Sequence, residues 1–74
     1  MLTDGIEREL LVEICNRFVV NKQELIGFLD GKVEKPAKVA DTLTKSLMDK
    51  ELIRYVEGQG CYAITQKGMR ELRE

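Results

Sequence analysis

The stretch of sequence that decides the fold is ELIRYVEGQGCYAITQKGMRELRE, residues 51–74. Apolar and β-prone residues run over positions 52–57 and return over 61–64, with Gly58-Gln59-Gly60 between them. Glycine tolerates positive φ, so this three-residue turn is typical of a bulged β-hairpin. Thr65 then precedes a polar segment at the position of a helix N-cap. The stretch therefore predicts a strand, a turn, a second strand and a helix.

A hairpin of two short strands is not stable by itself, so it must pack on something else. We expect its inward residues, and those of the helix that follows, to face helices formed by the preceding part of the chain. These inward residues are Ile53, Tyr62, Ile64, Met69 and Leu72.

A first helix is predicted over residues 5–17, with Asp4 as its N-cap and Glu7 completing a capping box. Glu13 and Arg17 have the spacing of a favourable surface pair. The apolar residues fall on one stripe, as in an amphipathic helix: Ile6, Leu10, Leu11, Ile14 and Phe18.

Two further helices follow a short apolar segment, residues 18–20, which is either a brief strand or a connector. Asn21, with Glu24 as capping-box partner, starts the second helix, and Gly31 is placed to end it in the left-handed conformation. Pro36 opens a third helix that ends near Lys50. Its predicted buried face carries Val39, Ala40, Leu43, Leu47 and Met48, and its exposed face carries Lys38, Asp41, Thr42, Lys45 and Asp49.

Three helices followed by a hairpin give an α+β chain with the layout of a winged helix-turn-helix domain, and residues 1–74 form one such domain. The segment LTKSLMDKELIRYVEGQGCYAITQKGMREL (43–72) resembles the second half of small archaeal and bacterial winged-helix transcription regulators, in the neighbourhood of the MarR and PadR proteins. The matching positions are Leu47, Lys50, Leu52, Ile53, Tyr62, Ile64, Thr65, Gly68 and Leu72.

The sequence departs from this family pattern at two places. Glu51 stands where the family usually has glycine, so we expect Lys50 to supply the left-handed residue that ends the third helix. The connection GKVEK, residues 31–35, is longer than usual. Gly68 fits the pattern, because it lets the last helix pass close to its neighbour.

Composition excludes several classes of protein. The 74 residues include no histidine, so the usual general base is absent and we do not expect an enzyme. Cys15 and Cys61 lack the spacing of a zinc site, and we expect both to be buried apolar residues. No cofactor motif is present. No apolar run is long enough to cross a bilayer and no signal peptide is recognisable, which predicts a cytoplasmic protein without membrane contact.

The resemblance implies double-stranded DNA as partner, with the third helix (36–50) in the major groove and the wing (54–61) on the backbone. The charges agree weakly, because residues 1–31 hold three basic and six acidic residues and residues 32–74 hold nine basic and seven acidic. The candidate DNA-binding residues are Lys35, Lys38, Thr42, Lys45, Ser46, Arg54 and Gln59.

Two other interpretations stay open. Lys38–Asp41 and Lys45–Asp49 have the spacing of ion pairs within a solvated helix, which would leave nothing for phosphate. A winged-helix chain of near-neutral charge also suits a protein–protein module in a larger assembly, and Asp41 and Asp49 would favour that use.

A homodimer is a separate prediction. An interface through the last helix, or through Leu2 and Leu11 of the first, would add stability to a small core.

Overall fold

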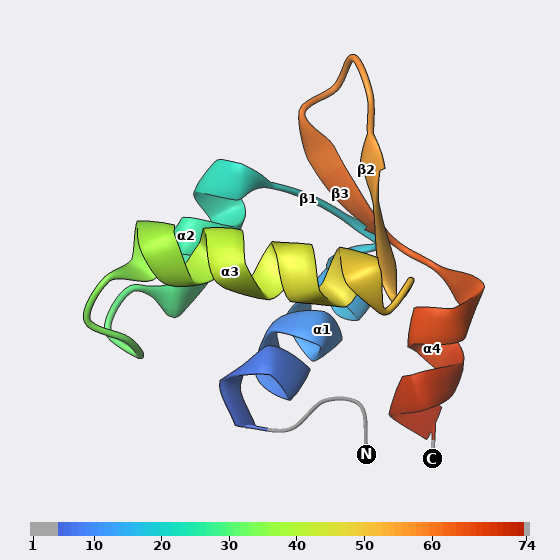
Figure 1. The fold of residues 1–74 in the computed structure, drawn as a ribbon, viewed down its shortest axis with the longest axis horizontal. Helices are drawn as coiled ribbons and strands as arrows, with labels where there is room; N and C mark the ends of the chain where they lie inside the picture. Colours follow the sequence, from blue (N-terminus) through green and yellow to red (C-terminus); the bar gives the residue numbers. More distant parts are fainter. Residues whose placement is uncertain (1–4, 74) are drawn as a thin grey trace.

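The fold is that of a computed structural model, which describes residues 5–73 (Figure 1). It is α+β, as the sequence predicts, with four helices and one three-stranded sheet. None of the helices in this range is long and apolar enough to cross a membrane. The elements in chain order are α1 (Gly5–Arg17), β1 (Val19–Asn21), α2 (Lys22–Leu29), α3 (Pro36–Asp49), β2 (Ile53–Val56), β3 (Cys61–Ile64) and α4 (Gln66–Arg73).

The short apolar segment after α1 is a strand, and it joins the hairpin in an antiparallel sheet of order β1-β3-β2. One row of the sheet pairs Val20, Tyr62 and Tyr55, and the neighbouring row pairs Val19, Ala63 and Arg54. Since side chains alternate along a strand, the two rows point to opposite faces. The first row shares its face with the buried Ile53 and Ile64.

The hairpin loop is one residue longer than the predicted three-residue turn. Val56 pairs with Cys61, so the strand ends before Glu57 and residues 57–60 form the loop. Gly58 and Gly60 both have positive φ, at 82° and 65°. The two glycines therefore adopt the left-handed backbone conformations that this loop needs to reverse the chain direction.

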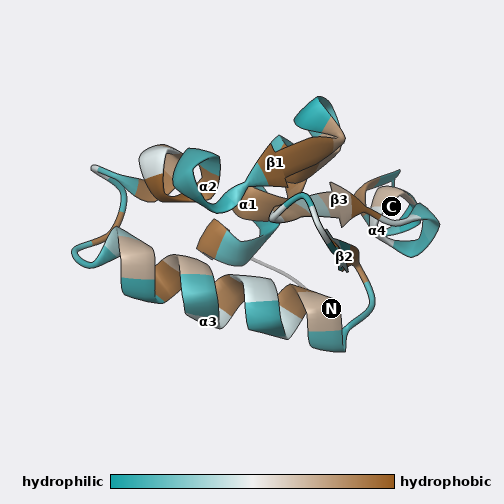
Figure 2. Cartoon of the chain, turned by 90° about the horizontal axis from the view of Figure 1, so that it is seen from above, coloured by the Kyte–Doolittle hydropathy of each residue, from teal (hydrophilic) through white to brown (hydrophobic). Residues whose placement is uncertain are grey.

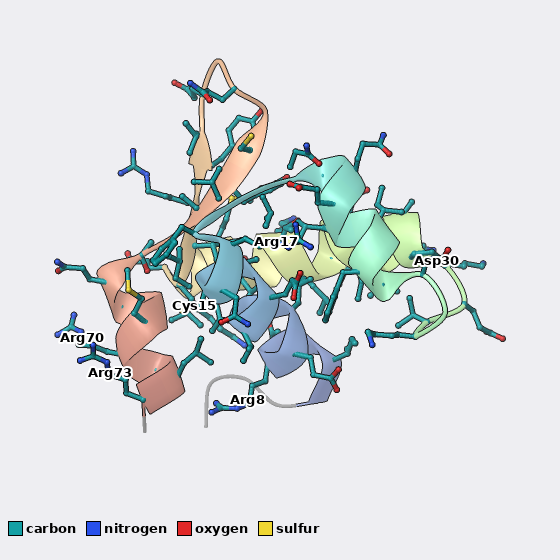
Figure 3. All side chains as sticks on the ribbon, turned by 180° about the vertical axis from the view of Figure 1, so that it is seen from behind. Arg8, Cys15, Arg17, Asp30, Arg70 and Arg73 are labelled. Atoms are coloured by element: carbon teal, nitrogen blue, oxygen red, sulfur yellow. The ribbon has the colours of Figure 1, made fainter. Side chains whose placement is uncertain are left out.

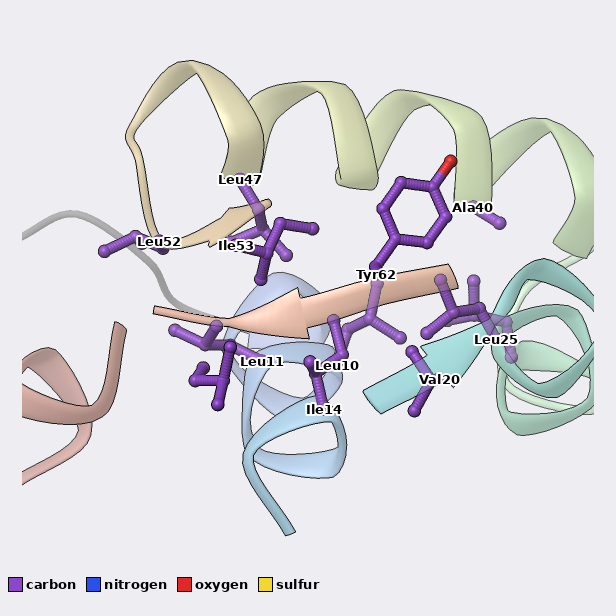
Figure 4. Close-up of a cluster of buried hydrophobic side chains, with 12 residues drawn as sticks. Leu10, Leu11, Ile14, Val20, Leu25, Ala40, Leu47, Leu52, Ile53 and Tyr62 are labelled. Atoms are coloured by element: carbon purple, nitrogen blue, oxygen red, sulfur yellow. The ribbon is translucent and has the colours of Figure 1, made fainter. Parts of the chain in front are cut away.

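The core gathers where the helices meet the inner face of the sheet (Figure 4). The predicted inward residues Ile53, Tyr62 and Ile64 belong to it. Its members are Leu10, Leu11, Ile14, Val20, Leu25, Leu29, Ala40, Leu47, Leu52, Ile53, Tyr62 and Ile64. Phe18, predicted on the apolar stripe of α1, is instead 60% exposed. It follows the helix with φ at 65°, and this left-handed turn swings its side chain away from the stripe.

The helix-start signals of α2 and α3 are confirmed. Asn21 accepts a hydrogen bond from the Glu24 amide (2.8 Å), and the Glu24 carboxylate accepts one from the Asn21 amide (2.9 Å). Gly31, after α2, has φ at 86°, and Pro36 is the first residue of α3. The predicted cap of α1 at Asp4 lies outside the described residues.

The buried face of α3 differs from the prediction, because it is centred on Ala40, Thr44 and Leu47. Val39 and Leu43 lie at its margin and are half-buried. Thr44 is tolerated in the core because its hydroxyl donates to the Ala40 carbonyl (2.8 Å), which leaves no unpaired donor.

α3 ends in a Schellman motif in which Glu51, not Lys50, is the left-handed residue. Glu51 has φ at 64°, whereas Lys50 is still helical at −84°. The Leu52 amide donates to the Leu47 carbonyl and the Glu51 amide to the Met48 carbonyl, both at 2.9 Å. These two bonds define the motif, and they hold Glu51 in a conformation that usually takes glycine.

Thr65 joins the start of α4 to the connection between α3 and β2. Its hydroxyl oxygen accepts from the Gly68 amide (3.0 Å), as predicted for an N-cap, and it lies 2.8 and 2.9 Å from the carbonyl oxygens of Glu51 and Leu52. One hydroxyl thus stabilises both a helix terminus and the turn that ends α3.

We expect Thr65→Ala to lower the free energy of unfolding by about 1–2 kcal/mol, the usual cost of losing a helix N-cap. Thr65→Ser keeps the hydroxyl and serves as the control. Urea denaturation of the two variants measures the difference. An alanine variant as stable as the serine variant would show that the cap contributes nothing.

Candidate nucleic-acid interface

The exposed face of α3 carries Lys38, Thr42 and Lys45 at spacings of four and three residues, so they lie in one stripe along the helix. α3 runs along one side of the molecule, with hydrophilic residues turned outward (Figure 2). Lys38 and Lys45 form no ion pair with any residue in 5–73, so the predicted pairs with Asp41 and Asp49 are not formed. Both ammonium groups are therefore available to an anion.

Asp41 is neutralised by a residue of another helix. The Lys22 ammonium, on α2, forms an ion pair with the Asp41 carboxylate. Both side chains are largely exposed, so the pair contributes little to stability. Its effect on the surface potential is larger, because it cancels a negative charge beside the lysine stripe. Asp49 is exposed and continues the stripe toward the end of α3 without such a partner among the described residues.

The other predicted residues of α3 have less prominent positions. Lys35 is the N-cap residue of α3, so it lies at the positive end of the helix dipole. Its side chain is exposed and makes no capping hydrogen bond. Thr42 is exposed, but its hydroxyl is 3.2 Å from the Lys38 carbonyl oxygen, to which it donates. Ser46 is half-buried beside the stripe.

The hairpin does not bring all of its predicted residues to this surface. Gln59 is exposed in the loop. Arg54 is exposed too, but it belongs to the row of Val19 and Ala63, on the face of the sheet opposite to Tyr62. Tyr62 points toward α3 (Figure 4). Arg54 therefore points away from α3 and does not extend the lysine stripe.

Tyr55 is the residue of the hairpin that the sequence reasoning missed. It pairs directly with Tyr62, so its side chain lies on the face that looks toward α3, and it is 47% exposed. The two rings meet edge to face, with centroids 5.4 Å apart. The pattern that would have found it is strand alternation, because Tyr55 lies two positions after the inward-facing Ile53.

Arg17, the last residue of α1, forms ion pairs with two carboxylates. Its guanidinium contacts Glu13 at 2.5 Å, the predicted pair, and Glu24 at 3.4 Å. The hydrogen bond that Arg17 donates to the Glu13 carboxylate, followed by the negative charges of Glu13 and Glu24, raises the pKa of Arg17. Arg17 is thus charged but already engaged, and we do not count it among the groups available to phosphate.

The thiols are free and separate from the lysine stripe. Cys15 and Cys61 are each half-buried rather than fully buried as predicted. The Cys61 thiol donates to the Gln59 carbonyl at 3.2 Å, within the hairpin loop. Across residues 5–73, no group of histidine, cysteine or acidic side chains has the arrangement of a metal site.

Comparisons with protein-family models, with curated proteins and with solved structures gave no match for this chain.

Proposed function

We propose that the protein binds double-stranded DNA as a winged-helix transcription regulator, with α3 in the major groove and the β2–β3 hairpin as the wing. The observation that carries this proposal is the stripe of Lys38, Thr42 and Lys45, whose ammonium groups have no carboxylate partners within residues 5–73. The pair between Lys22 and Asp41 removes a charge that would repel phosphate. The order and pairing of the elements suit the same fold.

The chemistry of the stripe indicates phosphate contact more than base reading. Lysine is a point charge and suits a phosphate oxygen, and contacts of this kind position a protein on the duplex without specifying sequence. The exposed face of α3 carries no arginine, asparagine or glutamine, the residues that pair bidentately with bases. We therefore propose binding of modest sequence discrimination, and a role in binding rather than in catalysis.

Replacing both Lys38 and Lys45 by alanine is expected to weaken duplex binding on any sequence. The slope of log Kd against log salt should fall by about 2, because each phosphate-contacting lysine accounts for about one unit. Fluorescence anisotropy with a random duplex, between about 50 and 200 mM salt, measures both quantities.

The matched control is the double variant Arg70→Ala/Arg73→Ala. It removes the same charge from α4, where both side chains are exposed (Figure 3). We expect it to keep the wild-type slope. Equal losses in the two double variants would show that the duplex responds only to net charge, and the α3 interface would be rejected.

The runner-up function is a protein–protein module. Two observations favour it: Asp49 lies exposed at the end of the stripe, and Arg54 turns away from it. The positive surface is therefore confined to the first two-thirds of α3. Absence of duplex binding by the wild-type protein at about 50 mM salt would decide for this alternative.

A further inference from the structure

Tyr55 on β2 is an exposed aromatic side chain whose position is set by its neighbours. It is 47% exposed, and its ring meets the Tyr62 ring edge to face, with centroids 5.4 Å apart. Its hydroxyl lies toward the end of the hairpin loop, because a Cβ atom at Gly60 would be 4.0 Å from the Tyr55 Oη atom. Tyr55 does not belong to the core. The hairpin therefore presents an oriented ring that is half open to solvent.

The ring borders the same corner of the molecule as the lysine stripe of α3. Tyr55 shares its face of the sheet with Tyr62, which points toward α3 (Figure 4). On α3, Asp41 points toward the start of α2, because it pairs with Lys22. The start of α2 and the hairpin lie on the same side of α3 (Figure 1). Lys45 follows Asp41 by one turn, so it points to that side too. DNA held by the stripe therefore lies beside the ring.

Within residues 52–64, the side of the hairpin that looks toward α3 carries no basic side chain. This segment contains one basic residue, Arg54, and it points to the other face of the sheet. The loop adds a carboxylate, Glu57. Contacts with the phosphate backbone derive their strength from lysine and arginine. This surface therefore has little to offer the DNA backbone, and its main feature is an uncharged aromatic ring.

An aromatic ring of this kind binds a nucleic acid by stacking on a base, and the stacking tolerates any sequence because every base has a π-face. In a continuous duplex each base face is covered by its neighbours, so the ring can contact only sugars and groove edges. An unpaired base that has left the stack offers its face. The exposed face of α3, within residues 36–49, fits the same kind of recognition, because its lysines hold DNA without reading its sequence.

We infer that Tyr55 stacks on an unpaired base, so that the protein binds a duplex interrupted by unpaired nucleotides more tightly than a continuous one. The lysine stripe holds the paired region through its phosphates, and the Tyr55 ring holds the base that has left the stack. The DNA is thus recognised by its structure rather than by its sequence. The inference rests on the proposed binding of DNA by α3 and deepens it by naming the form of DNA.

The surface belongs to a single chain, and the homodimer surfaces expected from the sequence are not part of it. Leu11 is completely buried in the core and cannot form an interface. Met69 and Leu72 of α4 pack against the core as well. Leu2 lies outside the described residues. Stacking by Tyr55 requires one copy of the chain only.

Fluorescence anisotropy with two duplexes of the same base-paired length and the same ends tests the inference. One is continuous, and the other has a short bulge of unpaired thymines at its centre. We expect the wild-type protein to bind the bulged duplex about tenfold more tightly, as for one base stacked on an aromatic side chain. The ratio of the two Kd values should be the same at about 50 and 200 mM salt, because an uncharged ring releases no counterions.

Two substitutions at Tyr55 separate stacking from packing. Tyr55→Phe keeps the ring and should keep the preference for the bulged duplex. Tyr55→Leu keeps an apolar side chain against Tyr62 but has no π-face, so it should bind the two duplexes equally.

The matched control removes an exposed ring elsewhere. Phe18 is 60% exposed, and its carbonyl accepts from the Ile64 amide, at the end of the sheet away from the hairpin loop. Phe18→Asn should therefore keep the preference for the bulged duplex. Asparagine tolerates the positive φ of this position, so the substitution should not disturb the fold.

The outcomes distinguish the inference from the function on which it rests. Equal binding of the two duplexes by the wild-type protein would overturn the inference and leave duplex binding by α3 intact. A preference that survives in Tyr55→Leu would assign the unpaired base to another residue and equally overturn it. Failure of the wild-type protein to bind either duplex at about 50 mM salt would reject the DNA-binding function, and the inference with it.

Discussion

Gly68→Ala is expected to lower the free energy of unfolding by about 3 kcal/mol, the upper part of the range for an overpacked core. A Cβ atom at this position would lie 2.3 Å from the Leu52 carbonyl oxygen and 2.8 Å from the Ile64 Cδ1 atom. The closer of these is a backbone atom in the turn that ends α3, so it cannot move without disturbing the Schellman motif. Urea denaturation measures the loss.

Gly27→Ala provides a matched control, since it is the same substitution inside another helix. A Cβ atom at Gly27 would meet nothing within 4 Å. There alanine should raise the free energy of unfolding by about 0.5–1 kcal/mol, because glycine is the poorer helix former. Opposite signs at the two glycines are the expected outcome, and a gain at both would contradict the close approach of α4 to Leu52.

The elements that the sequence predicted well are those whose signals are local. Asn21 and Glu24 form their capping box within three residues, and Thr65 caps α4 through the Gly68 amide. Both depend on side chains reaching backbone groups of the same turn. The close approach at Gly68 was predicted from family resemblance, and the distances at that glycine agree with it.

The errors arose where packing or a backbone turn decided the outcome. Glu51 takes the left-handed conformation although a side chain is disfavoured there, because the two amides of the Schellman motif need that position. Thr44 is buried because its hydroxyl can bond to the preceding turn. The periodicity of apolar residues makes Leu43 a better candidate for burial than Thr44. It contains no information on where the sheet will lie against α3.

The candidate interface was predicted in part for the same reasons. The helical spacing of Lys38, Thr42 and Lys45 is a property of one element and could be read from the sequence. The pair between Lys22 and Asp41 joins residues 19 positions apart on different helices, so it required the tertiary arrangement. The direction of Arg54 follows from strand alternation, because Arg54 is next to the inward-facing Ile53 and must point to the other face. The prediction of Arg54 as a DNA contact did not take this alternation into account.

The second large effect is expected at Tyr62, whose ring lies on the central strand between β1 and β2 and is only 9% exposed. Tyr62→Ala should lower the free energy of unfolding by about 3–4 kcal/mol, the cost of removing a buried aromatic ring. Tyr62→Phe keeps the ring and should stay within about 0.5 kcal/mol of the wild type. Urea denaturation of both variants compares the ring with the hydroxyl. A large loss in Tyr62→Phe would mean that the hydroxyl, not the ring, stabilises the sheet.

Tyr55 allows the structural and functional roles of this aromatic pair to be separated. Tyr55→Ala should cost only about 1 kcal/mol, because the side chain is half-exposed. A double-mutant cycle with Tyr62→Ala should give a coupling of about 0.5–1.5 kcal/mol for the edge-to-face contact. Additive losses in the cycle would show that the two rings do not interact in solution.

In the anisotropy assay, Tyr55→Ala should weaken duplex binding without changing the salt slope, since an uncharged ring releases no counterions. The Lys38→Ala/Lys45→Ala variant should change both the affinity and the salt slope. If Tyr55→Ala binds duplex like the wild type, the face of the hairpin that looks toward α3 does not meet DNA. Gln59 in the loop would then be the remaining candidate contact of the wing, even with the lysine stripe confirmed.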